Sequence, residues 1–197
     1  MIQPYIVRSL STRQIVLLTV MSALCVGIQL TPRPPNVEFT SLIIFLIGAV
    51  FGVSFGATLG ILVMFINGFL SPWGFAGLLL PFQIGGMVII GIVGGLYGRT
   101  MTNSRDARSY FEIAVLGAFL TLVYDVITNF GVAVSYMLIG TSAPLAFVNA
   151  IIFGAIFSVV HIVSNAAVFG MILVPLASTM ERFLGGEKTW RRELLPT

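Results

Sequence analysis

Polar side chains that could bind a small molecule lie within or beside long apolar stretches of this chain. Asp125 and Asn129 are four residues apart, which would place both on one face of a helix. Asn67, Gln83 and Asn149 occur near the ends of other apolar stretches. A carboxylate at the centre of a membrane helix costs about 2.5–3.5 kcal/mol on insertion scales, so Asp125 requires a partner, a water-filled cavity or a ligand. The chemistry that these groups offer is hydrogen bonding to a ligand.

The composition indicates that membrane helices must position these groups. The chain has 197 residues, of which 57% are hydrophobic and 9% charged, whereas a soluble domain has about 25% charged residues. We therefore expect one transmembrane domain over 1–197 and no separate soluble domain. The net charge is +3, but the basic residues flank apolar segments and form no patch, which argues against a nucleic-acid partner. The single cysteine, Cys25, excludes a disulfide framework.

Six apolar segments predict an all-α integral membrane protein with six transmembrane helices. About 20 helical residues cross a bilayer core, so the second segment is short and the sixth is long. With the N-terminus in the cytoplasm, nine of the ten Lys and Arg residues lie on the cytoplasmic side and only Arg33 lies outside. The positive-inside rule therefore predicts that both termini are cytoplasmic. The predicted helices are 14–30, 40–51, 55–70, 81–98, 111–134 and 147–174.

This topology places the polar groups in the outer half of the membrane, beneath three outer loops. The loops, 31–39, 70–77 and 135–146, are nearly uncharged and rich in Pro, Gly and aromatic residues, so we expect them to cap a ligand pocket. The alternative is that the polar groups hydrogen-bond between helices, where such bonds average about 0.6 kcal/mol. Trp73 and Tyr136 are the candidate aromatic lids, and Tyr124 should face elsewhere. The candidate ligand contacts are Asn36, Glu38, Asn67, Trp73, Gln83, Asp125, Asn129, Tyr136 and Asn149.

His161 and Asn165 form a second pair four residues apart, deeper in the membrane on the sixth helix. The chain has no other histidine and no spacing typical of a metal site. We therefore expect a packed histidine that hydrogen-bonds to a neighbouring helix, rather than a metal ligand or a proton relay. No nucleophile elbow, P-loop or acidic metal cluster occurs either, so we expect no enzyme activity, no cofactor and no metal.

Small residues recur at four-residue spacing along the first helix, at Thr19, Ala23 and Gly27. Such spacing lets the backbones of two membrane helices approach closely. This face either packs within the monomer or receives a partner subunit, and the spacing alone leaves both interpretations open.

An ordered set of motifs extends over 13–174. The set comprises PNVEFT (35–40), GAVFGVSFGATLG (48–60), Asn67, SPWG (71–74) and PFQIGGMVIIGIVGGLYGR (81–99). With six helices in under 200 residues, this set resembles the substrate-binding S component of energy-coupling factor (ECF) importers.

The resemblance implies a multi-pass protein of the plasma membrane that captures a vitamin or related micronutrient from outside. Such a protein docks on a transmembrane coupling subunit that carries two ATPase subunits, commonly through alanines spaced four apart on the first helix. Ala23 and Gly27 occupy that pattern. SPWG and PFQ are similar to members linked to cobalamin, which makes a corrinoid the first guess for the ligand, with riboflavin or another vitamin as alternatives. Cys25, on the first helix, is no counterpart of the cobalt-binding cysteine of one branch.

A different transport mechanism is the alternative function. The chain would then be a self-sufficient secondary transporter or facilitator in which Asp125 carries protons. A requirement for the ATPase subunits or for a proton gradient distinguishes the two functions.

Overall fold

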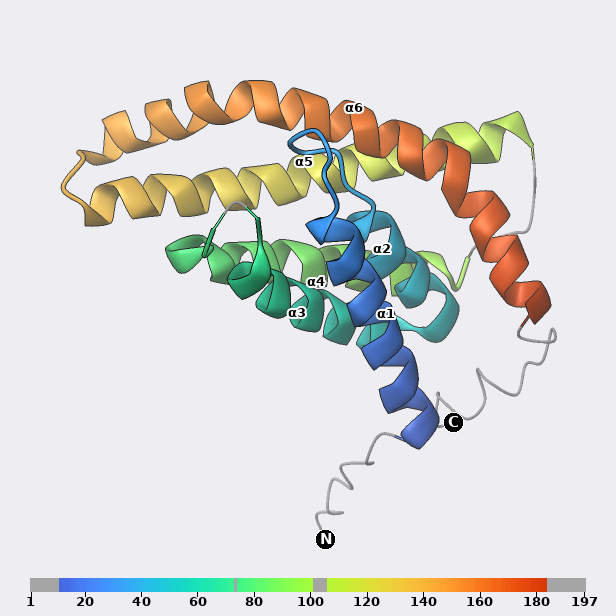
Figure 1. Ribbon diagram of the computed structural model, residues 1–197. Coiled ribbons are helices and arrows are strands. Elements are labelled where there is room, and N and C mark those ends of the chain that lie inside the picture. Colours follow the sequence, from blue (N-terminus) through green and yellow to red (C-terminus); the bar gives the residue numbers. More distant parts are fainter. Residues whose placement is uncertain (1–10, 73, 101–105, 184–197) are drawn as a thin grey trace, which may run out of the picture.

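A computed structural model describes residues 11–72, 74–100 and 106–183, the side chains of 181–183 excepted. This part of the chain is all-helical and contains no strand. Five of its helices are long and apolar enough to cross a membrane, whereas α2 has only 12 residues. The helices are α1 Thr12–Leu30, α2 Thr40–Phe51, α3 Val53–Leu70, the short 3₁₀ helix η1 Gly77–Leu79, α4 Leu80–Tyr97, α5 Ala107–Leu138 and α6 Ala143–Phe183 (Figure 1).

The helices α5 and α6 are longer than the sequence predicts. Their connection is the four residues 139–142, not the expected outer loop 135–146. Gly140, with a φ of 98°, makes the turn, and Pro144 lies in the first turn of α6, where its missing N–H costs no helical hydrogen bond. Proline and glycine near 140 therefore mark a tight turn between two helices. The chain changes direction again in the last turns of α6, where Pro175 lies inside the helix (Figure 1).

Glycines let α4 pack against both α2 and α3 at backbone contact distance. A Cβ added at Gly56 of α3 would lie 2.5 Å from the carbonyl oxygen of Gly91 of α4. A Cβ at Gly94 would overlap the carbonyl group of Phe45 of α2. Eleven of the twelve residues of α2 are buried as a result. The short helix α2 is thus enclosed by the rest of the protein. A helix that is apolar on all sides is expected to be buried in this way.

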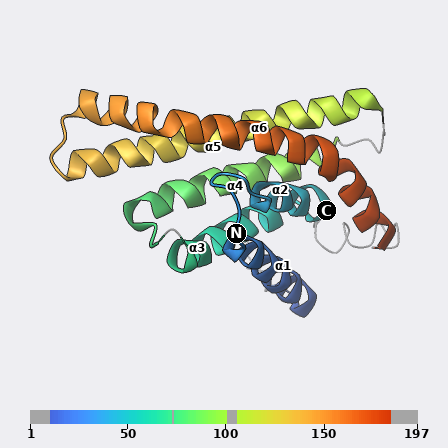
Figure 2. The same cartoon turned by 45° about the horizontal axis from the view of Figure 1, so that its top comes forward.

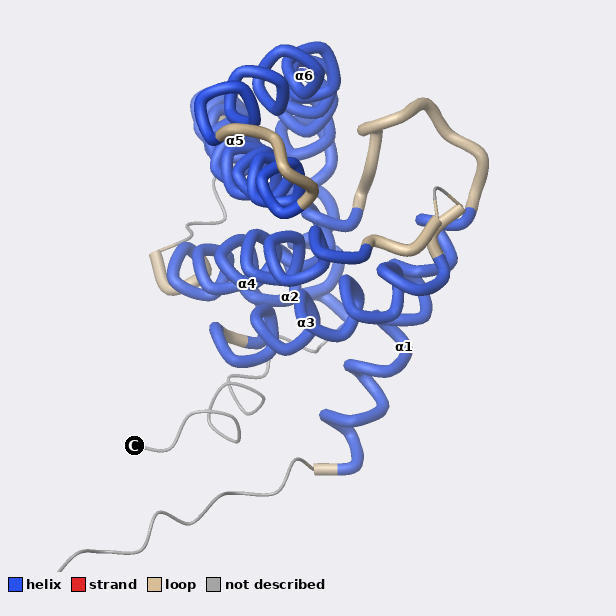
Figure 3. The backbone as a smooth tube through the Cα atoms, turned by 90° about the vertical axis from the view of Figure 1, so that its left-hand side faces the viewer, coloured by secondary structure: helices blue, strands red, loops and turns tan. Residues whose placement is uncertain are grey.

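The helices α5 and α6 pack side by side as a long antiparallel pair (Figures 1 and 2). In Figure 3, α5 and α6 lie on one side of the molecule and α1 to α4 on the other. The ring of Phe169 on α6 packs edge-on against Phe45 of α2, with 5.4 Å between the ring centroids. This contact joins the pair to the rest of the core. The α3–α4 and α5–α6 connections lie at the same end of the molecule (left in Figure 1).

Candidate ligand-binding site

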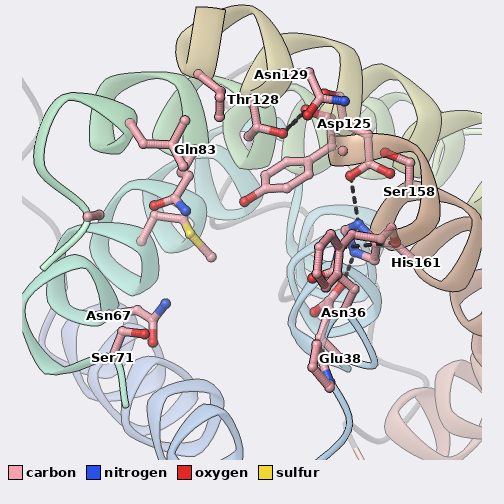
Figure 4. A pocket seen from close by; sticks show the side chains of 18 of the residues that line it. Asn36, Glu38, Asn67, Ser71, Gln83, Asp125, Thr128, Asn129, Ser158 and His161 are labelled. Atoms are coloured by element: carbon pink, nitrogen blue, oxygen red, sulfur yellow. Dashed lines mark hydrogen bonds and ion pairs between the residues drawn. The ribbon is translucent and has the colours of Figure 1, made fainter. Parts of the chain in front are cut away.

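A cavity of about 740 Å³ lies between the α5–α6 pair, α3, α4 and the segment 31–39. This volume is within the roughly 300–1,000 Å³ of small-molecule sites. Apolar side chains such as Met64, Met87, Phe153 and Phe157 form part of its surface. Its polar lining residues are Gln29, Arg33, Asn36, Glu38, Asn67, Ser71, Gln83, Tyr124, Asp125, Thr128, Asn129, Ser158 and His161 (Figure 4).

Six of the nine candidate contacts line this cavity. They come from four different parts of the chain, because α3, α4, α5 and the segment 31–39 each contribute at least one (Figure 4). Trp73 lies outside the described residues. The six that line the cavity are Asn36, Glu38, Asn67, Gln83, Asp125 and Asn129.

Two of the predicted contacts, Tyr136 and Asn149, are not among the residues that line this cavity. Tyr136 packs against a small cluster of alanines where α5 meets α6. Both residues have a suitable depth, but depth does not fix which face of a helix turns toward the cavity. Tyr124 lines the cavity although we expected it to face elsewhere, because that expectation also depended on the unknown rotation of the helix.

A buried group of three ionisable residues forms one side of the cavity. Nδ1 of His161 lies 2.8 Å from Oδ1 of Asp125, and Nε2 of His161 lies 3.5 Å from Oε1 of Glu38 (Figure 4). The three residues are only 4–7% exposed. The expected hydrogen bond from His161 to a neighbouring helix is confirmed, since Asp125 belongs to α5. One imidazole therefore faces two carboxylates in a largely buried site.

Glu38 is held by protein groups at both carboxylate oxygens. The backbone N–H of Ser41, in the first turn of α2, donates to Oε2 at 2.9 Å and so gains a partner that the helix itself does not supply. The Asn165 amide donates to Oε1 at 3.0 Å and also to the Thr121 hydroxyl at 2.9 Å. Burial opposes ionisation of Glu38, but its contacts with His161, Ser41 and Asn165 outweigh burial and lower its pKa to about 2. Glu38 is therefore a carboxylate whose hydrogen-bonding capacity is largely used within the protein.

Other polar groups of the cavity have no hydrogen-bond partner within the described part of the chain. Oδ1 of Asn67 is buried and lacks a donor. The side-chain amides of Gln83 and Asn129, which project from α4 and α5 (Figure 4), make no hydrogen bond to any described residue. Buried polar groups normally have a partner. A ligand could satisfy these three amides, and also three buried atoms without a partner among the described residues: Nε of Arg33, Oδ2 of Asp125 and Nε2 of His161.

The small residues of α1 lie on its exposed face. Thr19, Ala23 and Gly27 are all exposed, whereas Ser22 and Cys25 are buried on the other side of the helix. A Cβ added at Gly27 would meet no atom within 4 Å in the described chain. The described part of the chain therefore does not pack closely against this face.

The comparison with known proteins gives one match. Residues 9–182 match the family model described as "ECF-type riboflavin transporter, S component". No curated protein and no solved structure matches the chain.

Proposed function

The chain belongs to the family of ECF-type riboflavin transporter S components, and we propose that it binds its ligand in the cavity described above. It is accordingly a multi-pass membrane protein and a transport component, not an enzyme. S components of this kind bind a vitamin-like substrate and associate with an ECF module of membrane and ATPase subunits. The proposal concerns which ligand this chain takes and which of its residues do the binding.

The observation that carries the proposal is the cavity itself, with free amides on an otherwise largely apolar surface. Asn67, Gln83 and Asn129 project toward the same space from three helices, and each has an unused donor or acceptor. An apolar pocket with a few convergent polar groups is typical of small-molecule sites. We assign these amides as ligand contacts, and Trp73 remains a predicted lid.

Riboflavin is the proposed ligand, because it is the vitamin in the description of the matching family. The amides could hydrogen-bond to the carbonyl and N–H groups of a flavin ring, and the methionine and phenylalanine side chains could pack on its faces. A corrinoid, the first guess from SPWG and PFQ, is several times larger than a flavin. A cavity of about 740 Å³ favours the smaller ligand.

The exposed face of α1 is the proposed docking site for the coupling subunit that carries the two ATPases. Thr19, Ala23 and Gly27 follow one another at four-residue spacing on this face. A partner helix could approach their small side chains closely. We also propose cytoplasmic N- and C-termini, as the distribution of Lys and Arg predicts. Several of these basic residues, including Arg8, Arg105 and Arg191, lie outside the described residues.

Titration of the purified, detergent-solubilised protein with riboflavin tests the function. Binding should quench the fluorescence of the flavin, and Asn129→Ala should weaken it by about 0.5–1.5 kcal/mol, the usual net contribution of one hydrogen bond. Asn149→Ala is the matched control, because Asn149 is a half-buried asparagine that does not line the cavity. An equal loss in both variants would contradict the site. Absence of binding to the unmodified protein would contradict the ligand.

A further inference from the structure

The segment 31–39 connects α1 to α2 and forms one side of the cavity. We call it the wall segment. Arg33, Pro35, Asn36 and Glu38 of this segment line the cavity. It contains three prolines, which lack an N–H donor. Its internal backbone hydrogen bonding in the structure is one bond, from the N–H of Val37 to the carbonyl of Pro34 at 3.2 Å. The wall segment therefore depends on contacts with other elements for its position.

Apart from contacts with the adjoining helices α1 and α2, the wall segment forms polar contacts with α6. The Asn36 amide donates to the carbonyl of Phe157 at 3.1 Å, and the Ser164 hydroxyl donates to the carbonyl of Asn36 at 3.2 Å. Asn36 has a φ of 59°, a left-handed conformation that asparagine adopts more readily than most residues. Asn165, the residue after Ser164, binds Glu38. The wall segment is thus attached to α6 along two successive turns.

His161 and Asn165 of this attachment also bind a third element, α5, through Asp125 and Thr121 respectively. Both ring nitrogens of His161 face carboxylates, Nε2 toward Glu38 and Nδ1 toward Asp125 (Figure 4). Nδ1 hydrogen-bonds to Asp125, whereas Nε2 lies at ion-pair distance from Glu38 without a hydrogen bond to any described residue. Removing the imidazole would leave two buried carboxylates without their partner, which is strongly unfavourable. Glu38 can move out of the buried site because it lies on a segment with little structure of its own, whereas Asp125 is fixed on α5.

We propose that His161 is a positioning residue that holds the wall segment against α5 and α6 and thereby keeps the ligand in the cavity. This inference rests on the proposed function insofar as the cavity binds a ligand. Its structural part, the anchoring of residues 31–39, is independent of which ligand that is. Loss of His161 should release the wall segment before it disturbs the helices, because the glycine-mediated core of α2, α3 and α4 does not include it.

Hydrogen–deuterium exchange of the ligand-free protein tests the anchoring, and riboflavin kinetics test its consequence. In His161→Gln, the amides of 31–41 should exchange at least about tenfold faster, the factor that corresponds to one charge-assisted hydrogen bond, while those of α3 and α4 keep their rates. Riboflavin should dissociate faster by a similar factor, with a nearly unchanged association rate. Ser178→Ala is the control, because the Ser178 hydroxyl bonds within α6 to the carbonyl of Val174; its exchange at 31–41 should match that of the unmodified protein.

A second variant covers the case in which His161→Gln does not fold. Glu38→Gln keeps an oxygen for the N–H of Ser41 but removes the charge that faces His161, and it should show the same local increase in exchange. Weaker riboflavin binding with unchanged exchange at 31–41 would overturn the inference, since His161 would then act on the ligand directly. Faster exchange throughout α5 and α6 would also overturn it, as would a Glu38→Gln variant with unchanged exchange. The predicted exchange pattern without any riboflavin binding would instead overturn the proposed ligand and leave the anchoring in place.

Discussion

The glycine contact between α3 and α4 gives a prediction whose size can be worked out from the structure. A Cβ added at Gly91 would overlap the carbonyl group of Gly56 and lie 2.7 Å from the backbone nitrogen of Ala57. All of these neighbours are backbone atoms of α3, which cannot rotate away as a side chain could. Ordinary contact of a Cβ begins at 3.4 Å, and the nearest carbonyl atom of Gly56 lies about 1 Å inside that limit. The substitution Gly91→Ala therefore requires α3 and α4 to separate locally by about 1 Å.

The cost of this separation should exceed the gain from replacing glycine by alanine. Overpacking costs typically 1–3 kcal/mol, and the value here should be near the upper limit because backbone meets backbone. Alanine recovers at most about 1 kcal/mol through its higher helix propensity. We therefore expect a net loss of about 2 kcal/mol, which for a chain of this length lowers Tm by about 4–8 °C.

Gly85→Ala is the matched control for this measurement. Gly85 is on the same helix, and a Cβ at this position would meet nothing within 4 Å in the described part of the chain. Thermal unfolding of the two purified variants in one detergent, followed by intrinsic fluorescence, should show a lower Tm for Gly91→Ala alone. Riboflavin binding should also weaken in Gly91→Ala, because α4 carries Gln83 and Met87 into the cavity. Equal Tm values for the two alanine variants would refute the close-packing argument.

Four further predictions concern the buried charges, the docking face, the energy source of uptake and the topology. Asp125→Ala should weaken riboflavin binding by about 1–3 kcal/mol. It should also lower Tm, because it leaves His161 facing Glu38 alone, whereas substitution of a side chain without protein partners should not. Calorimetry measures the affinity, and a melting curve on the same sample measures Tm. Ala23→Trp or Gly27→Trp should block uptake and co-purification with the coupling and ATPase subunits while riboflavin affinity stays within about twofold, since the face is exposed; lost affinity with intact assembly would return this face to the monomer core. Uptake by the unmodified protein should require those ATPase subunits and continue without a proton gradient, which a secondary transporter would not do. A cysteine in place of Arg105 should react with a membrane-impermeant reagent only after the cells are opened.

Most helices of this protein can be predicted from its sequence, because the apolar runs and the residues that end them are local features of the chain. The starts and ends of α1, α2, α3 and α4 lie within two residues of the predicted ones, since Pro, Gly and charged residues flank each apolar run. The ends of α5 and α6 could not be placed in the same way. Pro144 is compatible both with a loop and with the first turn of a helix, and packing of α5 on α6 decides between them.

Some features of the site could likewise be predicted from the sequence, whereas others depend on the tertiary structure. The sequence alone determined that Asn67, Gln83, Asp125 and Asn129 lie at compatible depths, because depth follows from counting residues along a helix. Tertiary structure alone decided that Tyr124 lines the cavity while Tyr136 and Asn149 do not, because the rotation of each helix is set by the neighbours on which it packs. It also decided that Glu38 and His161, which are 123 positions apart in the chain, share one buried site with Asp125. No local pattern encodes such a contact, since it forms only when the wall segment folds against α6 and each buried charge must find a partner there.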